Sequence, residues 1–217
     1  MCFSAAASFS VAGATALIGV SAVRHARDAR ELALAVVPLF FAVQQATEGM
    51  IWLQLTGAGN PGDIAALVLV FRGFAEVLWP AFTAIAVLLI EPDQRRRFAL
   101  RIVAGIGIVV SIYLLAALLE EPAVATIRNH SIDYGNRTSA LSWRLIPYIL
   151  CTCLPLLLSS HRAIQLFGCV VASGYLISAV VYFTTFVSVW CFFAAAGSTL
   201  IYLHFRTAAA GATTAAR

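Results

Sequence analysis

Residues 98–119 read FALRIVAGIGIVVSIYLLAALL and contain a single charged side chain, Arg101. Three arginines at 95–97 come directly before this stretch, and two glutamates at 120–121 come directly after it. A helix needs about 20 mostly apolar residues to cross the hydrocarbon core of a bilayer. Because lipid offers no hydrogen-bond partner to bare backbone, the stretch predicts a membrane-spanning helix.

The same pattern recurs in both directions from this stretch. The chain of 217 residues is 61% apolar and only 11% charged, whereas an average soluble chain has about 25% charged residues. The sequence predicts an all-α integral membrane bundle of seven transmembrane helices. It forms a single domain over 1–206, with a disordered Ala/Thr-rich tail at 207–217. The predicted spans are 4–23, 32–55, 64–90, 98–119, 143–159, 164–184 and 187–205.

The arginines between the spans predict the orientation of the chain. The joints after the first, third, fifth and seventh spans carry three arginines within 24–30, three at 95–97, Arg162 and Arg206. The positive-inside rule places these joints in the cytoplasm, with the N-terminus outside and the C-terminus cytoplasmic. Heavy use of arginine and alanine is typical of a GC-rich bacterial source. We therefore expect a multi-pass protein of the bacterial inner (cytoplasmic) membrane.

Composition also excludes several classes of function. The net charge of +4 comes from short basic clusters beside the spans, so anionic lipid headgroups are the expected partner and nucleic acid is not. The chain has no lysine, which excludes a retinal bound as a Schiff base. A homo-oligomer or another membrane partner remains open.

Five polar side chains lie inside the second and third spans: Gln44, Gln45, Glu48, Arg72 and Glu76. Ionisable groups at this depth are costly and are candidates for function by default. Arg72 and Glu76 have the i, i+4 spacing of an ion pair on one helix face. The two spans are joined by a short loop, so the five residues are expected to line one polar pocket that opens outward. The alternative is that they hold the helices together without further chemistry.

A second hypothesis concerns a metal. The outer loop at 120–142 is long for so economical a chain, and it contains His130. Together with Cys2 and Glu48, His130 would form a soft-to-borderline ligand set for a transition metal. If Met1 is removed, Cys2 also presents its amine next to its thiol. The alternative for Cys2 is an unprocessed surface thiol, and the other cysteines are expected to pack as small apolar groups.

At the opposite face, a polar cluster ends the fifth span. Ser159, Ser160, His161 and Arg162 follow one another there. We expect these residues to cap the helix end, with His161 and Arg162 contacting lipid headgroups. A catalytic use of the hydroxyl and imidazole groups would need an acidic partner, and the neighbouring sequence has none.

Several short stretches form a recognisable set along the chain. They are MCFSA at 1–5, ASF at 7–9, QQ at 44–45, EG at 48–49, Trp52, LWP at 78–80, LLIEP at 88–92, LLSSHR at 157–162, FG at 167–168, VWCFFAA at 189–195 and IYLHF at 201–205. Together these stretches resemble the DUF6629 family of small bacterial and archaeal multipass membrane proteins of unknown function. The resemblance runs nearly end to end and implies the membrane fold, but no activity. It gives weight to Cys2 and Glu48, whereas Arg72 and Glu76 fall outside it.

Three functions follow from these residues. In the first, the protein binds or transports a small solute, an ion or a proton. Glu48 is then the titrating or ligand-contacting group, and the loop around His130 is a lid. In the second, it is an outward-facing metal-binding protein or metalloenzyme that uses Cys2, His130 and Glu48. In the third, it is an accessory subunit of a membrane complex, and its polar residues meet a partner helix.

Overall fold

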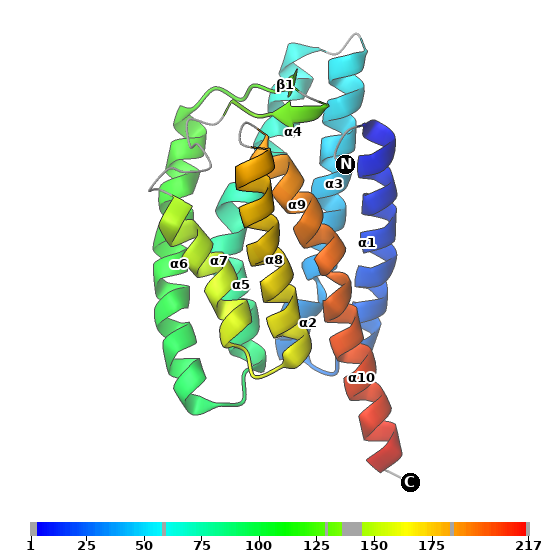
Figure 1. Ribbon diagram of the computed structural model, residues 1–217, viewed down its shortest axis with the longest axis vertical. Coiled ribbons are helices and arrows are strands. Elements are labelled where there is room, and N and C mark those ends of the chain that lie inside the picture. Colours follow the sequence, from blue (N-terminus) through cyan, green and yellow to red (C-terminus); the bar gives the residue numbers. More distant parts are fainter. Residues whose placement is uncertain (1–3, 58–59, 129, 136–144, 183–184, 216–217) are drawn as a thin grey trace.

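The computed structural model is a bundle of helices with one β-hairpin at one end (Figure 1). It describes residues 4–57, 60–128, 130–135, 145–182 and 185–215. Within these ranges, six helical segments are long and apolar enough to cross a membrane, and a seventh, Leu145–Leu158, is apolar but shorter. The six are Ala5–His25, Ala29–Thr56, Pro61–Ile90, Gln94–Glu120, Arg162–Val181 and Phe186–Thr207.

Three of the long segments are built from helices that continue one another. Pro38 lies in the first turn of α3 and Pro80 in the first turn of α5. A proline lacks the N–H that would bond one turn back, so each marks a break in the regular ladder. The joined elements are α2 (Ala29–Ala35) with α3 (Val37–Thr56); α4 (Pro61–Arg72) with the π-helical turn η1 (Gly73–Leu78) and α5 (Trp79–Ile90); and α9 (Phe186–Gly197) with α10 (Thr199–Ala215).

The remaining elements are single helices and the hairpin. Helices α1 and α2 lie on either side of a short turn, where Asp28 caps α2 by accepting hydrogen bonds from the amides of Arg30 and Glu31. These bonds, that from Glu31 above all, lower the pKa of the Asp28 carboxyl. The elements are α1 (Ala5–His25), α6 (Gln94–Glu120), β1 (Thr126–Arg128), β2 (Ser131–Asp133), α7 (Leu145–Leu158) and α8 (Arg162–Val181).

The helices pack through close approaches at glycine. On the α1–α3 interface, a Cβ at Gly19 would lie 2.6 Å from the Leu39 side chain, and one at Gly49 would lie 2.9 Å from the ring of Phe9. The paired positions run in opposite directions, so α1 and α3 are antiparallel. Small residues that let helices approach closely are typical of membrane bundles.

The prediction of an all-α membrane fold is confirmed in its coarse form. The predicted span at 143–159 corresponds to α7, with 143–144 outside the described residues. Helix α10 continues to Ala215 and so includes most of the tail that the sequence predicts to be disordered, with 216–217 outside the described residues. Alanine is the best helix former, which is a sufficient reason for the extension.

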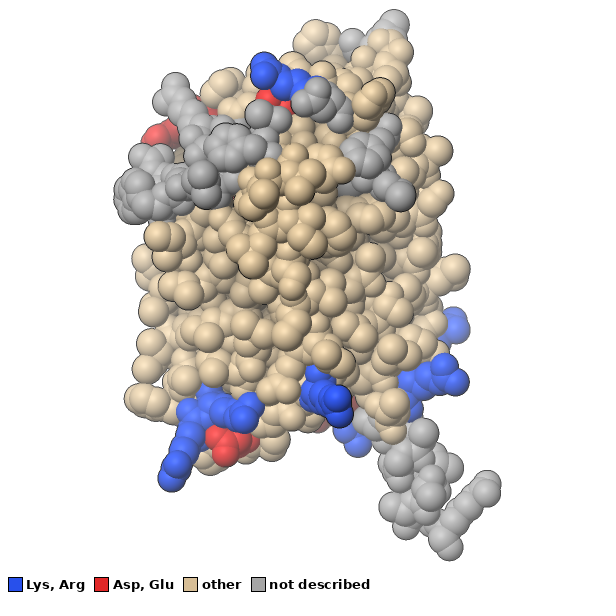
Figure 2. Space-filling view, in the orientation of Figure 1, with Lys and Arg blue, Asp and Glu red and all other residues tan. Residues whose placement is uncertain are grey.

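On the face shown in Figure 2, charged side chains lie at the two ends of the molecule. Figure 2 shows an apolar belt between them, with arginines gathered at the end from which α10 projects. Many large apolar side chains in the belt face outward, including Leu17, Phe98 and Val180. A soluble protein rarely exposes so continuous an apolar surface. The belt therefore matches the hydrocarbon of a bilayer.

Candidate functional site

Glu48 is the most deeply buried acidic group near the hairpin end of the bundle. Its side chain is completely enclosed. One carboxylate oxygen, Oε1, accepts hydrogen bonds from Ser188 Oγ at 2.5 Å and from Tyr134 Oη at 3.3 Å. The three residues come from α3, α9 and the segment after β2, so three parts of the chain meet at one carboxylate.

The local structure explains how each partner reaches Glu48. Helix α9 places Ser188 against Glu48. About one turn later on α9, Cys191 lies next to Gln44, which comes about one turn earlier on α3 than Glu48. These pairs run in opposite directions, so α9 lies antiparallel to α3 at this point. The sequence analysis did not single out Ser188 as a site residue. A serine in an otherwise apolar run was the only signal.

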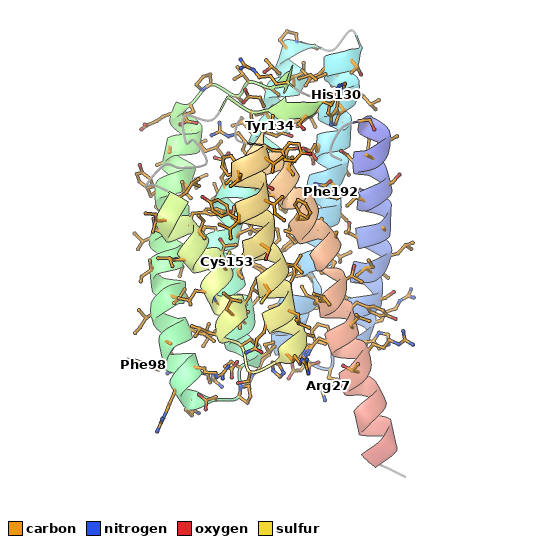
Figure 3. The ribbon with its side chains drawn as sticks, in the orientation of Figure 1. Arg27, Phe98, His130, Tyr134, Cys153 and Phe192 are labelled. Atoms are coloured by element: carbon orange, nitrogen blue, oxygen red, sulfur yellow. The ribbon has the colours of Figure 1, made fainter. Side chains whose placement is uncertain are left out.

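Tyr134 is held over Glu48 by the hairpin and by α4. Strands β1 and β2 pair antiparallel, with Ile127 opposite Ile132, and Ile132 is completely buried. The ring of Tyr134 stacks on Phe71, with ring centroids 4.4 Å apart and planes 14° apart. Figure 3 shows Tyr134 just beneath the hairpin, between the hairpin and the helices. Tyr134 was also missed from the sequence, because a loop tyrosine gives no sign of its contact.

Gln44 and Gln45 complete this polar group, which we call the Glu48 centre (Gln44, Gln45, Glu48, Tyr134 and Ser188). Both glutamines are completely buried. The Gln45 amide oxygen and nitrogen have no hydrogen-bond partner among the described residues, whereas the Gln44 amide lies beside the Cys191 thiol. In an α-helix, positions three and four residues apart share one face, so Glu48 lies between the two amides on the helix surface.

Arg72 and Glu76 form the ion pair that their spacing predicts. Arg72 Nε lies 2.9 Å from Glu76 Oε1, and Arg72 Nη2 lies 3.1 Å from Glu76 Oε2. A second acid, Glu121 at the end of α6, lies 2.7 Å from Nη2. Sequence reasoning missed Glu121, because its approach depends on the packing of α6 against η1. The guanidinium is thus held between two carboxylates.

The five residues predicted to line one outward pocket fall into two groups. Glu76 lines a cavity of about 30 Å³ with Tyr148, Trp190 and Cys191. A second, apolar cavity of about 40 Å³ lies beyond the same three residues, among α2, α3, α5, α7, α8 and α9. Cys191 also neighbours Gln44, so it lies between the Glu48 centre and the Glu76 cavity. Glu48 itself is enclosed and does not open outward.

The predicted metal ligands are not brought together in the described part of the chain. Cys2 lies outside the described residues. His130 is exposed at the hairpin turn, with a φ of 58°, whereas Glu48 is enclosed below. Figure 3 shows His130 at the level of the hairpin, with Tyr134 below it. No cluster of three or more His, Cys, Asp or Glu that could hold a metal is found among the described residues.

At the arginine-rich end, the predicted polar cluster joins two turns of the chain. Ser160 donates through both its hydroxyl and its amide to the buried carboxylate of Glu91. Arg96 Nη1 donates to the carbonyls of Leu158 and Ser159, at 2.9 and 2.8 Å. The acidic partner that the neighbouring sequence lacks therefore comes from another turn. Together, the bonds of Glu91 and Arg96 hold the α5–α6 turn against the α7–α8 turn. We call this set of hydrogen bonds the fastening.

His161 and Arg162 differ in their surroundings at this end. Arg162 is exposed, as expected of a headgroup contact, but His161 is half-buried. The His161 ring lies 4.7 Å from that of His204, measured between centroids, and its Nε2 lies 3.3 Å from the carbonyl oxygen of Ile90. The His161 side chain therefore takes part in packing between the turns.

Comparison with known proteins places the chain in a family without giving it an activity. No curated protein matches the chain, and no solved structure does. The model of the DUF6629 family, described as a family of unknown function, matches residues 1–216. That match covers nearly the whole chain, in agreement with the resemblance carried by its motifs. The chain therefore belongs to the DUF6629 family.

Proposed function

We propose that this protein binds a small solute, ion or proton at the Glu48 centre and carries it across the membrane. In this proposal the chain crosses the membrane seven times, with α7 as the shortest crossing. The hairpin end faces outward, and the arginine-rich end faces the cytoplasm of a bacterial inner membrane. The cytoplasmic position of the arginine-rich end follows from the positive-inside rule.

The observation that carries the proposal is the complete burial of a carboxylate among polar groups within a membrane bundle. Such groups are costly to bury and typically mark pathways for ions, protons or substrates. The buried amide of Gln45 supports this, because its oxygen and nitrogen have no hydrogen-bond partner among the described residues. A purely structural cluster would be expected to satisfy its own hydrogen bonds.

The cavities support a pathway rather than a single closed site. The Glu76 cavity and the apolar cavity share Tyr148, Trp190 and Cys191 as a common wall. Tyr134 covers Glu48 from the hairpin side, so movement of the hairpin would open the centre. In this proposal the hairpin acts as the lid, as expected from the sequence for the loop around His130.

The test is charge movement in reconstituted vesicles. Proteoliposomes on a solid-supported membrane receive jumps of pH, of alkali cations and of pooled small metabolites. The wild-type protein is expected to give a transient current for at least one of them, and Glu48→Gln is expected to abolish it. Cys2→Ser is expected to retain it. No current beyond that of protein-free vesicles, or equal loss in both variants, would overturn the proposal.

A matched control separates loss of function from loss of folding. Glu91 is a second buried carboxylate bonded to a serine, but it lies at the opposite end of the bundle. Glu91→Gln therefore resembles Glu48→Gln in the burden it places on folding. It is expected to retain the current, provided that both variants elute as folded protein.

A further inference from the structure

We infer that the Glu48 centre binds a dehydrated monovalent alkali cation such as Na⁺ through side-chain oxygens of α3, α9 and the hairpin segment. This inference rests on the site of the proposed function and names the class of ion that the site takes. It does not depend on whether that ion is transported.

The donor chemistry favours a hard cation. The centre offers a carboxylate from Glu48, hydroxyls from Ser188 and Tyr134, and amide oxygens from Gln44 and Gln45. Oxygen atoms of these types are the ligands that hard cations prefer, whereas transition metals favour imidazole and thiolate. The set therefore differs in kind from the cysteine and histidine set considered from the sequence.

The hydrogen bonds already formed are compatible with such a cation. Ser188 and Tyr134 each donate their one hydroxyl hydrogen to Glu48 Oε1. A hydroxyl that donates its hydrogen still keeps lone pairs that can face a cation. The same bonds hold the carboxylate and both hydroxyls in place, so the oxygens are oriented before an ion arrives.

The two glutamines point most directly to a missing ligand. Both side chains are completely buried. The oxygen and nitrogen of the Gln45 amide have no hydrogen-bond partner within the described ranges, and the Gln44 amide lies beside the Cys191 thiol. A buried amide without a partner is destabilising. A cation bound beside Glu48 would contact the amide oxygens, because positions 44, 45 and 48 share one helix face.

The charge of the site selects a monovalent ion. Glu48 is the one acidic residue of the centre, and its side chain is enclosed from solvent. One negative charge balances one positive charge, and burying the neutral pair is far less costly than burying either charge alone. A divalent cation would leave an uncompensated charge at this depth. It would also lose a more tightly held hydration shell.

The experiment measures the thermal unfolding of the detergent-purified full chain in NaCl, KCl, CaCl₂ and choline chloride at matched ionic strength. Ligand binding raises the unfolding temperature. A concentration of Na⁺ about 100 times Kd is expected to raise it by about 5–10 °C relative to choline. Binding of ²²Na⁺, followed by scintillation proximity, is expected to saturate at one ion per chain.

Variants connect the shift to the proposed ligands. Glu48→Gln is expected to abolish the Na⁺-dependent shift in unfolding temperature. Ser188→Ala and Gln45→Met are each expected to lower the apparent affinity for Na⁺ at least fivefold. Ser198→Ala is the matched control, because Ser198 is also buried but bonds a carbonyl of its own helix turn. It should retain the full shift. If Glu48→Gln does not fold, the two milder variants carry the test.

The outcomes separate this inference from the proposed function. A pH-dependent shift without any Na⁺ effect would overturn the alkali cation and assign a proton to Glu48. A shift caused by Ca²⁺ alone would also overturn it. If vesicle currents need Glu48 but Na⁺ has no effect on unfolding, the proposed function stands and the cation inference falls. If Na⁺ binds but no stimulus produces a current, the cation inference stands and the proposed function falls.

Discussion

Gly107 shows how a single residue decides the packing of two helices. A Cβ placed there would lie 2.2 Å from the carbonyl oxygen of Pro80, which is backbone and cannot move aside cheaply. Gly107→Ala is therefore expected to lower the unfolding temperature markedly. Gly105→Ala is the matched control, since a Cβ there meets nothing within 4 Å. It should be neutral or stabilise by up to about 1 kcal/mol, because alanine is the better helix former. Thermal unfolding in detergent measures both, and equal effects would contradict the packing described.

Arg72 leads to a second prediction at this scale. Removing one partner of a buried ion pair costs about 3–5 kcal/mol, because the remaining charge is left without compensation. Arg72→Met leaves Glu76 and Glu121 facing each other and should destabilise strongly. Combining it with Glu76→Gln and Glu121→Gln should recover most of the lost stability, as measured by unfolding in detergent. A triple variant no more stable than Arg72→Met would show that the arginine acts through packing rather than charge.

The candidate site was predictable at the residue scale only where its geometry is local. The Arg72–Glu76 pair follows from helical spacing alone, and Glu48 from its charge within an apolar run. Ser188 lies 140 residues from Glu48 in the sequence. Its contact depends on the antiparallel placement of α9 against α3, which no local pattern encodes. The same holds for Glu121, whose bond to Arg72 requires α6 to pack against η1.

Among the elements, the π-helical turn η1 is stabilised by a hydrogen bond from another helix, α7. Pro80 has no N–H to bond the carbonyl one turn earlier, and the backbone before it widens into η1. Tyr148 Oη from α7 donates to the Ala75 carbonyl in this turn, at 2.5 Å. Tyr148→Phe should cost about 1 kcal/mol in unfolding free energy, the typical net value of one hydrogen bond. Tyr113→Phe, at an exposed position on α6, should be neutral.

The fastening between the two arginine-end turns gives another prediction. Arg96 donates to two carbonyls at the end of α7, where the last carbonyls of a helix lack partners within the helix. Arg96→Met should therefore lower the unfolding temperature. The adjacent Arg95 is exposed, so Arg95→Met should have little effect while removing the same charge. If both variants lose stability equally, net charge rather than the fastening is responsible.

The elements themselves were largely readable from the sequence, but their joints were not. Each predicted span overlaps a helical segment of the structure, because about 20 apolar residues leave few alternatives in lipid. The joint at Val36, between α2 and α3, interrupts one apolar run without any change in composition. The hairpin was also missed, since its strands have three residues each and offer too little alternation to detect.

The whole molecule is organised by two opposed ends and the belt between them. A group of arginines lies at the end from which α10 projects (Figure 2). The hairpin lies at the other end, together with Tyr134, which donates to Glu48 (Figure 3). The apolar belt explains why the fold class was predictable from composition alone. It also explains why function was not, because the belt accounts for most residues and carries no chemistry. A role for the few polar groups inside the belt can be inferred only from their three-dimensional arrangement.

The orientation of the whole molecule is testable with single cysteines. Asp63 is exposed near the hairpin end, and Arg95 is exposed at the arginine-rich end. In a Cys2→Ser background, Asp63→Cys should react with a membrane-impermeant maleimide on intact cells. Arg95→Cys should react only after the membrane is permeabilised. The buried thiols of Cys151, Cys153 and Cys191 should stay unlabelled in both.

The reverse labelling pattern would overturn the orientation and, with it, the outward position of the Glu48 centre. Labelling of both sites on intact cells would instead contradict an odd number of crossings between them. Asp63 lies in the first turn of the segment Pro61–Ile90, and Arg95 follows the end of that segment. A single crossing by this segment would therefore place them on opposite sides. Because this segment also carries Arg72 and Glu76, the experiment fixes which side of the membrane their ion pair lies closer to. That in turn decides whether the proposed ligand of the Glu48 centre, at the same end of the bundle, arrives from outside the cell.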